Sequence, residues 1–352
     1  MLVLSKIVSL SDPSALVIIS LCSKDANIAI KSVARFKNWQ LDMLTGQYPR
    51  AGLTYKGKDT YKSESVLGIR SSSELLTNQH SESVTIGNFK VPILVDNTCR
   101  YASLNDDGTV VLNGEIGYCL DTYWEDRIEG MKQVIEYVSD LFQLSVSMVY
   151  IDRGDEWVFE WIKHRQNEKL KKVGVEILGS ERYPKEELEL VLSSTPTDSL
   201  SISALAPEHF RFTGNFPIVD YLFIRYGKWM TVGDLMNIDS MECQLWDTTL
   251  SGTDINQFLH FWIEGGSPRL QYLEVETEKH LDFLSIFGND WKNEFRLEQT
   301  HEVRLYYPRP DGIECLFEGG YTIQRKNGLK ATINCARNEF LMVIWPQSIV
   351  SD

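Results

Sequence analysis

Residues 245–273 read LWDTTLSGTDINQFLHFWIEGGSPRLQYL, and the fold is predicted by working outward from this stretch. Two short apolar strands are centred on Leu245 and Leu273, and residues 253–264 between them have the periodicity of a helix. Four apolar residues of that helix share one face: Ile255, Phe258, Leu259 and Trp262. The Gly-Gly pair that follows ends the helix, because glycine is favoured just after a last helical turn. The stretch therefore predicts a strand, a helix and a second strand, with Trp262 buried against the strands.

Comparable units recur along the middle of the chain. Short apolar strands 20 to 28 residues apart are centred on Val149, Val175, Ile202, Leu222, Leu245 and Leu273. Such intervals fit a strand, a crossover and a return, so we expect the six strands side by side in one parallel sheet, with helices on its outer face. Because one unit buries its apolar face only by stacking on the next, residues 126–290 are predicted to form a leucine-rich-repeat-like stack. No strict Leu-x-x-Leu-x-Leu recurs, so an ordinary α/β domain is the alternative.

The remaining parts of the chain follow other patterns. Residues 1–38 are predicted to form three short helices, and residues 39–125 a β-rich region, because Gly, Ser, Thr and Asn separate short β-branched runs. Residues 291–352 alternate in polarity and are predicted to form an antiparallel β end-piece. Turns are expected at Gly87-Asn88 and at Asn327-Gly328. The expected fold class is α/β, or α+β over the whole chain.

The composition argues against several classes of partner. The 35 basic and 49 acidic residues give a net charge of −14, which disfavours a surface that follows nucleic acid phosphates. The longest apolar run, Ala15–Cys22, is too short to span a bilayer, and the first residues lack the basic region of a secretory signal. The six cysteines lie far apart, as is typical of reduced thiols. We therefore expect a cytoplasmic or nuclear protein that binds neither nucleic acid nor membrane.

Residue types that often carry chemistry occur here without the spacing that the chemistry requires. The glycine pairs do not precede a helix as phosphate-binding loops do. The six histidines lack metal-ligand spacing, and no Gly-x-Ser-x-Gly sequence surrounds a nucleophile. The sequence predicts no catalytic residue, no cofactor and no metal. An uncharacterised hydrolase or transferase is the alternative that the sequence leaves open.

The N-terminal stretch Val3–Lys24, VLSKIVSLSDPSALVIISLCSK, resembles the later part of an F-box. Its Leu-Cys-Ser-Lys ending carries much of the resemblance, whereas the Leu-Pro opening of an F-box is absent. In that family three helices bind the Skp-type adaptor of a cullin ubiquitin ligase. The resemblance implies that seven apolar residues contact the adaptor: Leu4, Ile7, Val8, Leu10, Pro13, Leu16 and Leu21.

The rest of the chain resembles the type-2 F-box-associated domain that is abundant in nematodes. Three segments carry the resemblance: Trp229–Leu235, Leu250–Leu273 and Gly319–Ile333. The resemblance implies a substrate-recognition adaptor, not an enzyme, that joins a Skp-type adaptor and cullin scaffold to a protein client for ubiquitination. Because the F-box lacks its opening, the alternative is a protein-binding scaffold that no longer attaches to the ligase.

Overall fold

A computed structural model gives the fold of the chain. It describes residues 8, 11–33, 36, 38–46, 48–56, 61–75, 81–96, 100–104, 110–116, 119–176, 181–194, 196–288, 298–300, 305–308, 314–317 and 320–345. The chain divides into two compact units, Met1–Lys171 and Lys172–Asp352. Each unit contains a mixed β-sheet and several helices.

Unit 1 begins with two short helices and continues into strands. Its elements are α2 Pro13–Cys22, α3 Lys24–Val33, β1 Trp39–Leu44, β2 Arg50–Lys56, β3 Tyr61–Ser71, the 3-10 turn η1 Ser72–Glu74, β4 Glu82–Ile86, β5 Phe89–Asp96, β6 Arg100–Leu104, β7 Val110–Ile116, β8 Cys119–Trp124, α4 Arg127–Phe142, β9 Val146–Ile151 and α5 Trp157–Arg165. Asp12 caps α2, because its carboxylate accepts a hydrogen bond from the Ser14 amide at 2.8 Å, and Pro13 fills the first helical position.

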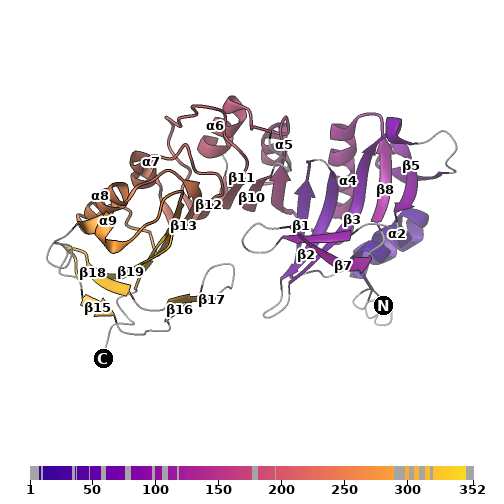
Figure 1. Cartoon of the computed structure of the whole chain (residues 1–352). Coiled ribbons are helices and arrows are strands. Elements are labelled where there is room, and N and C mark those ends of the chain that lie inside the picture. Colours follow the sequence, from indigo (N-terminus) through magenta and orange to yellow (C-terminus); the bar gives the residue numbers. More distant parts are fainter. Residues whose placement is uncertain are drawn as a thin grey trace. The chain divides into compact units, whose positions relative to one another are not determined.

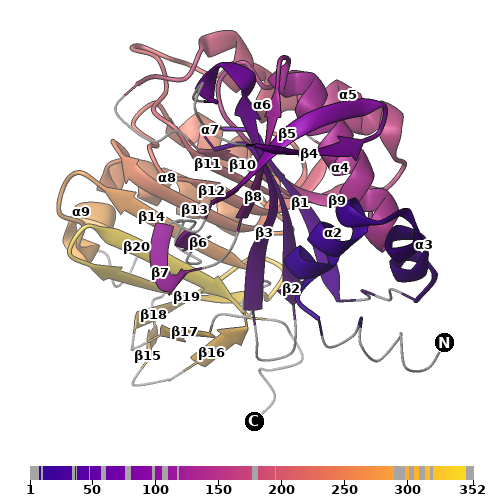
Figure 2. The same ribbon diagram turned by 90° about the vertical axis from the view of Figure 1, so that its right-hand side faces the viewer.

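The main sheet of unit 1 has the strand order β9-β1-β2-β3-β8-β5-β4. The pairs β1–β9 and β3–β8 are parallel and the other pairs are antiparallel. Helix α4 packs on this sheet through a buried apolar stripe of Met131, Val134, Ile135, Val138 and Leu141. The Tyr137 hydroxyl of α4 contacts Ser20 of α2 at 2.7 Å and accepts from Asn27 of α3 at 3.1 Å. Figure 2 shows these three helices together beside β1 and β2.

A half-buried ion pair joins β3 and β8. Arg70 Nε lies 2.9 Å from Asp121 Oδ2, and Thr122 Oγ1 donates to the Gly68 carbonyl at 2.7 Å. A Cβ atom at Gly68 would overlap the Asp121 carboxylate. Glycine is therefore required at position 68, because the Asp121 carboxylate that binds Arg70 occupies the space that a side chain at this position would fill.

Unit 2 alternates strands with helices and then turns to strands alone. Its elements are β10 Leu170–Glu176, which starts at the end of unit 1, α6 Lys185–Ser194, β11 Thr197–Ser203, β12 Val219–Ile224, α7 Val232–Asn237, β13 Ser240–Thr248, α8 Gly252–Ile263, β14 Tyr272–Thr277, α9 Phe283–Phe287, β15 Glu298–Thr300, β16 Leu305–Pro308, β17 Glu314–Phe317, β18 Gly320–Gln324, β19 Lys330–Ala336 and β20 Glu339–Ile344. Strands β11, β12, β13 and β14 are sequential parallel neighbours. Beyond β14 the order continues antiparallel through β20, β19, β18 and β15.

One face of the unit-2 sheet is apolar and lies under α8 and α9. Leu273 of β14 pairs with Cys243 and Met342, and Met342 pairs with Ile333, so these four side chains point to the same side. That side faces the helices, because Tyr321, opposite Ile333, stacks edge-on against Phe283 of α9 with centroids 4.6 Å apart. Figure 1 shows α7, α8 and α9 along one side of these strands.

Helix α8 buries the predicted apolar face. Its side chains Ile255, Phe258, Leu259 and Trp262 are all at most 1% exposed, so the predicted burial of Trp262 is confirmed. The Arg325 guanidinium lies 5.3 Å from the Trp262 ring centroid and donates to the Gly266 carbonyl just beyond α8. A cation beside the carbonyl end of a helix is stabilising, so Arg325 clamps α8 to the turn after β18.

Several predictions about turns and strands are confirmed. Gly87 has a φ of 59° between β4 and β5, and Gly328 has a φ of 89° between β18 and β19. The described strands of the predicted end-piece pair antiparallel. The strands around Ile202, Leu222, Leu245 and Leu273 are parallel and sequential, as predicted.

The predicted fold class, however, is wrong. No three-helix F-box is evident among the described residues, because α2 and α3 pack with α4 on the unit-1 sheet instead of forming a separate module. A leucine-rich-repeat-like stack is also not formed. The parallel strands are part of a mixed sheet, which antiparallel β20 continues directly from β14. The strand around Val149 is β9 of unit 1, where its neighbour β1 comes from the predicted β-rich region. The predicted domain limits at residues 38, 125 and 290 stay predictions.

Candidate functional site

The sheet face opposite α8 and α9, here named the far face, carries polar and aromatic side chains. In β13 the alternation that sends Cys243 and Leu245 toward the helices sends Gln244 and Trp246 to the far face. The same alternation places three further residues of neighbouring strands on this face: Tyr221, Tyr272 and Glu274. Gln244 and Tyr272 are buried, at 2% and 3% exposed, whereas Tyr221, Trp246 and Glu274 are half-buried. A face that packs on an apolar helix layer carries mainly apolar residues, so the composition of the far face is unlike that of the face under α8 and α9.

Hydrogen bonds join these side chains across three strands. The Glu274 carboxylate accepts from Gln244 Nε2 at 2.9 Å, from Trp246 Nε1 at 2.8 Å and from the Tyr272 hydroxyl at 2.8 Å. The Tyr221 hydroxyl donates to Gln244 Oε1 at 2.7 Å. Because each side chain is held by its neighbour, the far face is preorganised, which lowers the entropy cost of binding a partner.

An acidic group follows where β14 meets β20. Glu276 and Glu339 are directly opposite each other in the antiparallel register, and Glu274 lies two residues before Glu276. Burial raises the pKa of Glu339, and the negative charges of Glu274 and Glu276 act in the same direction. Asn338 Nδ2 donates to Glu276 Oε1 at 3.1 Å and holds that carboxylate in place. Like charges directly opposite in a sheet are destabilising, so the acidic group is a cost to the fold.

An apolar cluster borders the acidic group. It consists of Tyr272, Val343 and Trp345, with half-buried Leu341 packed against them. Trp345 is oriented by a hydrogen bond from its Nε1 to Thr332 Oγ1 at 2.9 Å. Tyr272, Val343 and Trp345 are 3%, 1% and 9% exposed, so Leu341 is the side chain of the cluster that is left half-buried.

Charged residues also connect the loops that leave the parallel strands. Lys228 Nζ, after β12, lies 2.6 Å from Glu278 after β14 and 3.5 Å from Asp247 at the end of β13. The Glu278 carboxylate raises the pKa of Lys228, and Lys228 in turn lowers the pKa of Glu278. Asp247 has a left-handed φ of 50°, which follows a register shift in β13 and turns its carboxylate toward Lys228. These three exposed charges order one edge of the sheet.

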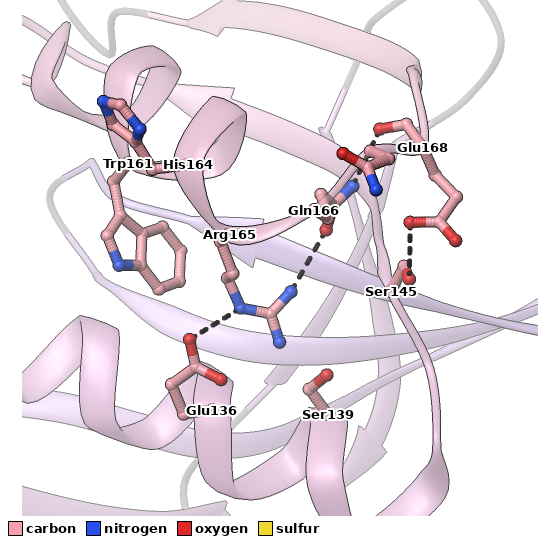
Figure 3. Close-up of a pocket in the computed structure, with 9 residues that line it drawn as sticks. Glu136, Ser139, Ser145, Trp161, His164, Arg165, Gln166 and Glu168 are labelled. Atoms are coloured by element: carbon pink, nitrogen blue, oxygen red, sulfur yellow. Dashed lines mark hydrogen bonds and ion pairs between the residues drawn. The ribbon is translucent and has the colours of Figure 1, made fainter.

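A second candidate site is a polar pocket of about 600 Å³ in unit 1. Its lining comes from α4, α5 and the turns beside β9, and Figure 3 shows the side chains. Arg165 Nε donates to Glu136 Oε1 at 2.8 Å, and its guanidinium lies 5.5 Å from the Trp161 ring centroid. Gln166 bonds to both backbone groups of Val146, at 3.0 and 2.8 Å. The polar side chains therefore hold α4, α5 and β9 together.

Neither of the two serines that line the pocket is paired with a histidine. Ser139 Oγ donates to the Leu144 carbonyl at 2.5 Å, and Ser145 Oγ donates to Glu168 Oε2 at 3.3 Å. The His164 imidazole contacts Glu160 at 3.2 Å and points away from both serines in Figure 3. A serine nucleophile is commonly activated by an imidazole base, and the described residues that line this pocket do not form that pair.

The predicted adaptor-binding residues fall into three groups. Leu4, Ile7 and Leu10 lie outside the described residues. Val8, Pro13 and Leu16 are buried within unit 1, and Leu16 is only 2% exposed. Leu21 is half-buried, and Ile19 on the same helix is 49% exposed. Adaptor binding by these residues stays a prediction.

The far face was not identified from the sequence. Its signal is present in β13, where Glu242, Gln244 and Trp246 alternate with Cys243 and Leu245. Such alternation predicts that one side of a strand carries polar side chains and does not pack against an apolar helix layer. Such a local signal cannot predict the pairing of Glu276 with Glu339, because their strands are far apart in the sequence. Asn338, which directly precedes Glu339, is 62 residues from Glu276.

Three further observations concern metal ions, membranes and cysteine thiols. Among the described residues no three His, Cys, Asp or Glu side chains come close enough to hold a metal ion. No helix in the described part of the chain combines the length and apolar character needed to cross a membrane. Cys22, Cys243 and Cys335 are free thiols, and burial raises the pKa of Cys243 and of Cys335 to about 12.

Comparison with known protein families gives a match for one segment of the chain. Residues 210–275 match the model of the family described as F-box associated. A stretch of 58 residues is 31% identical to the E3 ubiquitin-protein ligase hecw-1 of Caenorhabditis elegans, over 16% of this chain and 5% of that protein. No solved structure matches the chain. The matched residues include the predicted segments Trp229–Leu235 and Leu250–Leu273, so the chain contains an F-box-associated domain at residues 210–275.

Proposed function

We propose that this protein is a substrate-recognition subunit of a cullin-type ubiquitin ligase. Its N-terminal helices bind a Skp-type adaptor, and the far face of unit 2 binds a protein client in the cytoplasm or nucleus. The observation that carries the proposal is that the hydrogen-bonded residues of the far face lie inside the F-box-associated match: Tyr221, Gln244, Trp246, Tyr272 and Glu274. The chain needs no nucleophile of its own, because a conjugating enzyme supplies the ubiquitin.

On the adaptor side, α2 offers only part of the predicted surface. Val8, Pro13 and Leu16 are buried and support the helix, whereas Ile19 and Leu21 reach toward solvent. Apolar residues left exposed on a short helix are candidates for burial against a partner. We assign the adaptor contact to Ile19 and Leu21.

A double substitution tests the adaptor contact. Ile19→Asp with Leu21→Asp places two charges in an interface that excludes water, so we expect co-precipitation of a Skp-type adaptor to fall at least tenfold. The matched control is Leu190→Asp, which alters a 39%-exposed leucine of α6 in unit 2. Both proteins are checked for folding by circular dichroism. Unchanged adaptor binding by the folded double variant contradicts the assignment of α2.

The burial of Val8, Pro13 and Leu16 favours a second candidate, a client-binding scaffold that does not attach to a ligase. The two candidates differ in one measurement. The ligase subunit supports ubiquitination of a bound client in a reconstituted reaction with adaptor, cullin and conjugating enzyme. The scaffold binds the same client but neither the adaptor nor the cullin.

A further inference from the structure

We propose that a pocket in unit 1 binds a free α-amino acid with an apolar side chain. The pocket has a volume of about 310 Å³ and lies outside the F-box-associated segment, residues 210–275. Its lining comes from the loops after β1 and β9 and from the N-terminal turns of α4 and α5. The inference does not rest on the proposed function, because neither α2 nor the far face contributes to this lining.

The pocket lies where two neighbouring parallel strands end. β1 and β9 are parallel, and just after β1 the Thr45 amide donates to the Tyr150 carbonyl of β9 at 2.9 Å. From β1 the chain turns to β2, on the side away from β9, whereas from β9 it passes through a short loop into α5. In sheets covered by helices, ligands bind outside the carboxyl ends of parallel strands, where such connections leave in different directions. The topology of unit 1 therefore places this pocket at a position that suits a small molecule.

Asp155 fixes the loop after β9 beside the pocket. Its carboxylate accepts from the Asp152 amide at 3.4 Å and from Trp157 Nε1 at 3.3 Å. A hydrogen bond from the Thr45 hydroxyl joins the same carboxylate to the loop after β1. Lys132 Nζ lies 5.2 Å from the Trp157 ring centroid and supports the indole. The lining is thus held in place before a ligand arrives, which lowers the entropy cost of binding.

The lining carries charges of both signs. Arg127 and Arg153 are exposed cations, and Asp152 and Asp155 are the carboxylates. The two carboxylates repel a simple anion, and the two guanidinium groups repel a simple cation. A molecule with both an ammonium group and a carboxylate is attracted, because each of its charges has an opposite partner in the lining. Burial raises the pKa of Asp155 and the charge of Asp152 acts in the same direction, so a ligand ammonium group also offsets their repulsion.

Apolar side chains define the third part of the ligand. Ile128 at the start of α4 is 41% exposed, and Met131, three residues later, is 2% exposed. Buried Pro49 and half-buried Trp157 complete the apolar part of the lining. An apolar group that covers Ile128 removes it from water, which is favourable. A volume of about 310 Å³ is at the lower end for ligand pockets and suits a molecule of amino-acid size better than a dinucleotide.

Isothermal titration calorimetry with the full chain tests the proposal. The probes are L-leucine and L-phenylalanine, their N-acetyl and amide derivatives, and glycine. The N-acetyl derivatives lack the ammonium group, the amide derivatives lack the carboxylate, and glycine lacks the apolar side chain. We expect at least one of the two amino acids to bind, and its two derivatives and glycine to bind about tenfold more weakly, because each loses one interaction.

The other outcomes contradict the proposal. No heat of binding for either amino acid overturns it. Binding of the amide derivative as tight as that of the amino acid points to the amino terminus of a protein chain as the ligand. Equally tight binding of the N-acetyl derivative points to a carboxyl terminus. Either result overturns the assignment of a free amino acid.

Matched variants connect the binding to the pocket. Arg127→Gln removes a cation from the lining, and the control Lys163→Gln removes one from a 74%-exposed position of α5 outside the lining. We expect Arg127→Gln to bind the amino acid about tenfold more weakly and the amide derivative as the wild type does, since that derivative has no carboxylate for Arg127. Asp152→Asn is expected to weaken binding of the amino acid and to leave binding of the N-acetyl derivative unchanged.

Melting temperatures show that each variant is folded. Arg127 is exposed at the first position of α4, so its replacement is not expected to lower stability. Equal affinities of the Arg127 and Lys163 variants for the amino acid, or wild-type affinity of the folded Asp152 variant, overturn the proposal.

Discussion

Replacing Trp262 by alanine removes the largest fully buried side chain of the chain's described part. The indole lies in α8 under the unit-2 sheet, and Arg325 covers it at 5.3 Å from the ring centroid. Truncation leaves a cavity and also removes the aromatic ring that the Arg325 guanidinium contacts. Both effects act against the folded state.

The magnitude follows from the burial. Truncation of a fully buried tryptophan costs about 3–5 kcal/mol, out of about 5–15 kcal/mol for a whole domain. For a domain of this size each kcal/mol lowers the melting temperature by about 2–4 °C, so we expect a decrease of about 6–20 °C. Trp262→Phe is expected to cost less, because the indole Nε1 has no hydrogen-bond partner among the described residues and its loss removes no bond.

Thermal unfolding followed by circular dichroism measures these differences. Gln257→Ala, at an exposed position of the same helix, is the control and is expected to change the melting temperature by no more than a few degrees. A folded Trp262→Ala protein with the melting temperature of the wild type would contradict the buried position of this side chain, since a buried ring cannot be removed without a loss of stability.

Three other predictions follow from the packing and the thiols. Gly68→Ala is expected to lower the free energy of unfolding by about 1–3 kcal/mol in urea titrations, because the new methyl group displaces the Asp121 carboxylate from its ion pair. Arg325→Ala is expected to cost about 1.5–3 kcal/mol in the same titration, since the carbonyl beyond α8 loses a charged donor. In the native protein at pH 8, iodoacetamide is expected to label exposed Cys22 within minutes and to leave Cys243 unmodified, as judged by mass spectrometry. The reason is that Cys243 is buried and its pKa of about 12 keeps it a protonated thiol, so it reacts only after unfolding.

Sequence patterns predicted the local structure well where the pattern itself is local. The strand, helix and strand of residues 245–273 are β13, α8 and β14, and the turns at Gly87 and Gly328 were predicted from residue type. Helical periodicity also gave the burial of Trp262, because a stripe of apolar residues on one helix face is removed from water when the helix packs on a sheet.

Such patterns do not predict which distant strands pair with each other. Leu41 of β1 pairs with Val146 of β9, and Glu276 of β14 pairs with Glu339 of β20, although nothing in either segment encodes its partner. The two failures of the predicted fold have this origin. A repeat stack was expected because apolar strands recur 20 to 28 residues apart, but this spacing does not reveal that β20 pairs with β14 in the same sheet. An F-box module was expected from the resemblance of Val3–Lys24, but that stretch does not reveal the contact between Ser20 of α2 and Tyr137 of α4.

The position of β20 has a consequence for synthesis of the chain. The strand lies between β14 and β19, so β14 has one partner until residues 339–344 have left the ribosome. Translation at about 5–20 residues per second then leaves β14 unpaired on one side for several seconds after its own residues emerge. An unpaired apolar edge recruits strands from other chains. Unit 2 is therefore expected to depend on chaperones during translation, and a nascent chain stalled before residue 339 is expected to aggregate or be degraded.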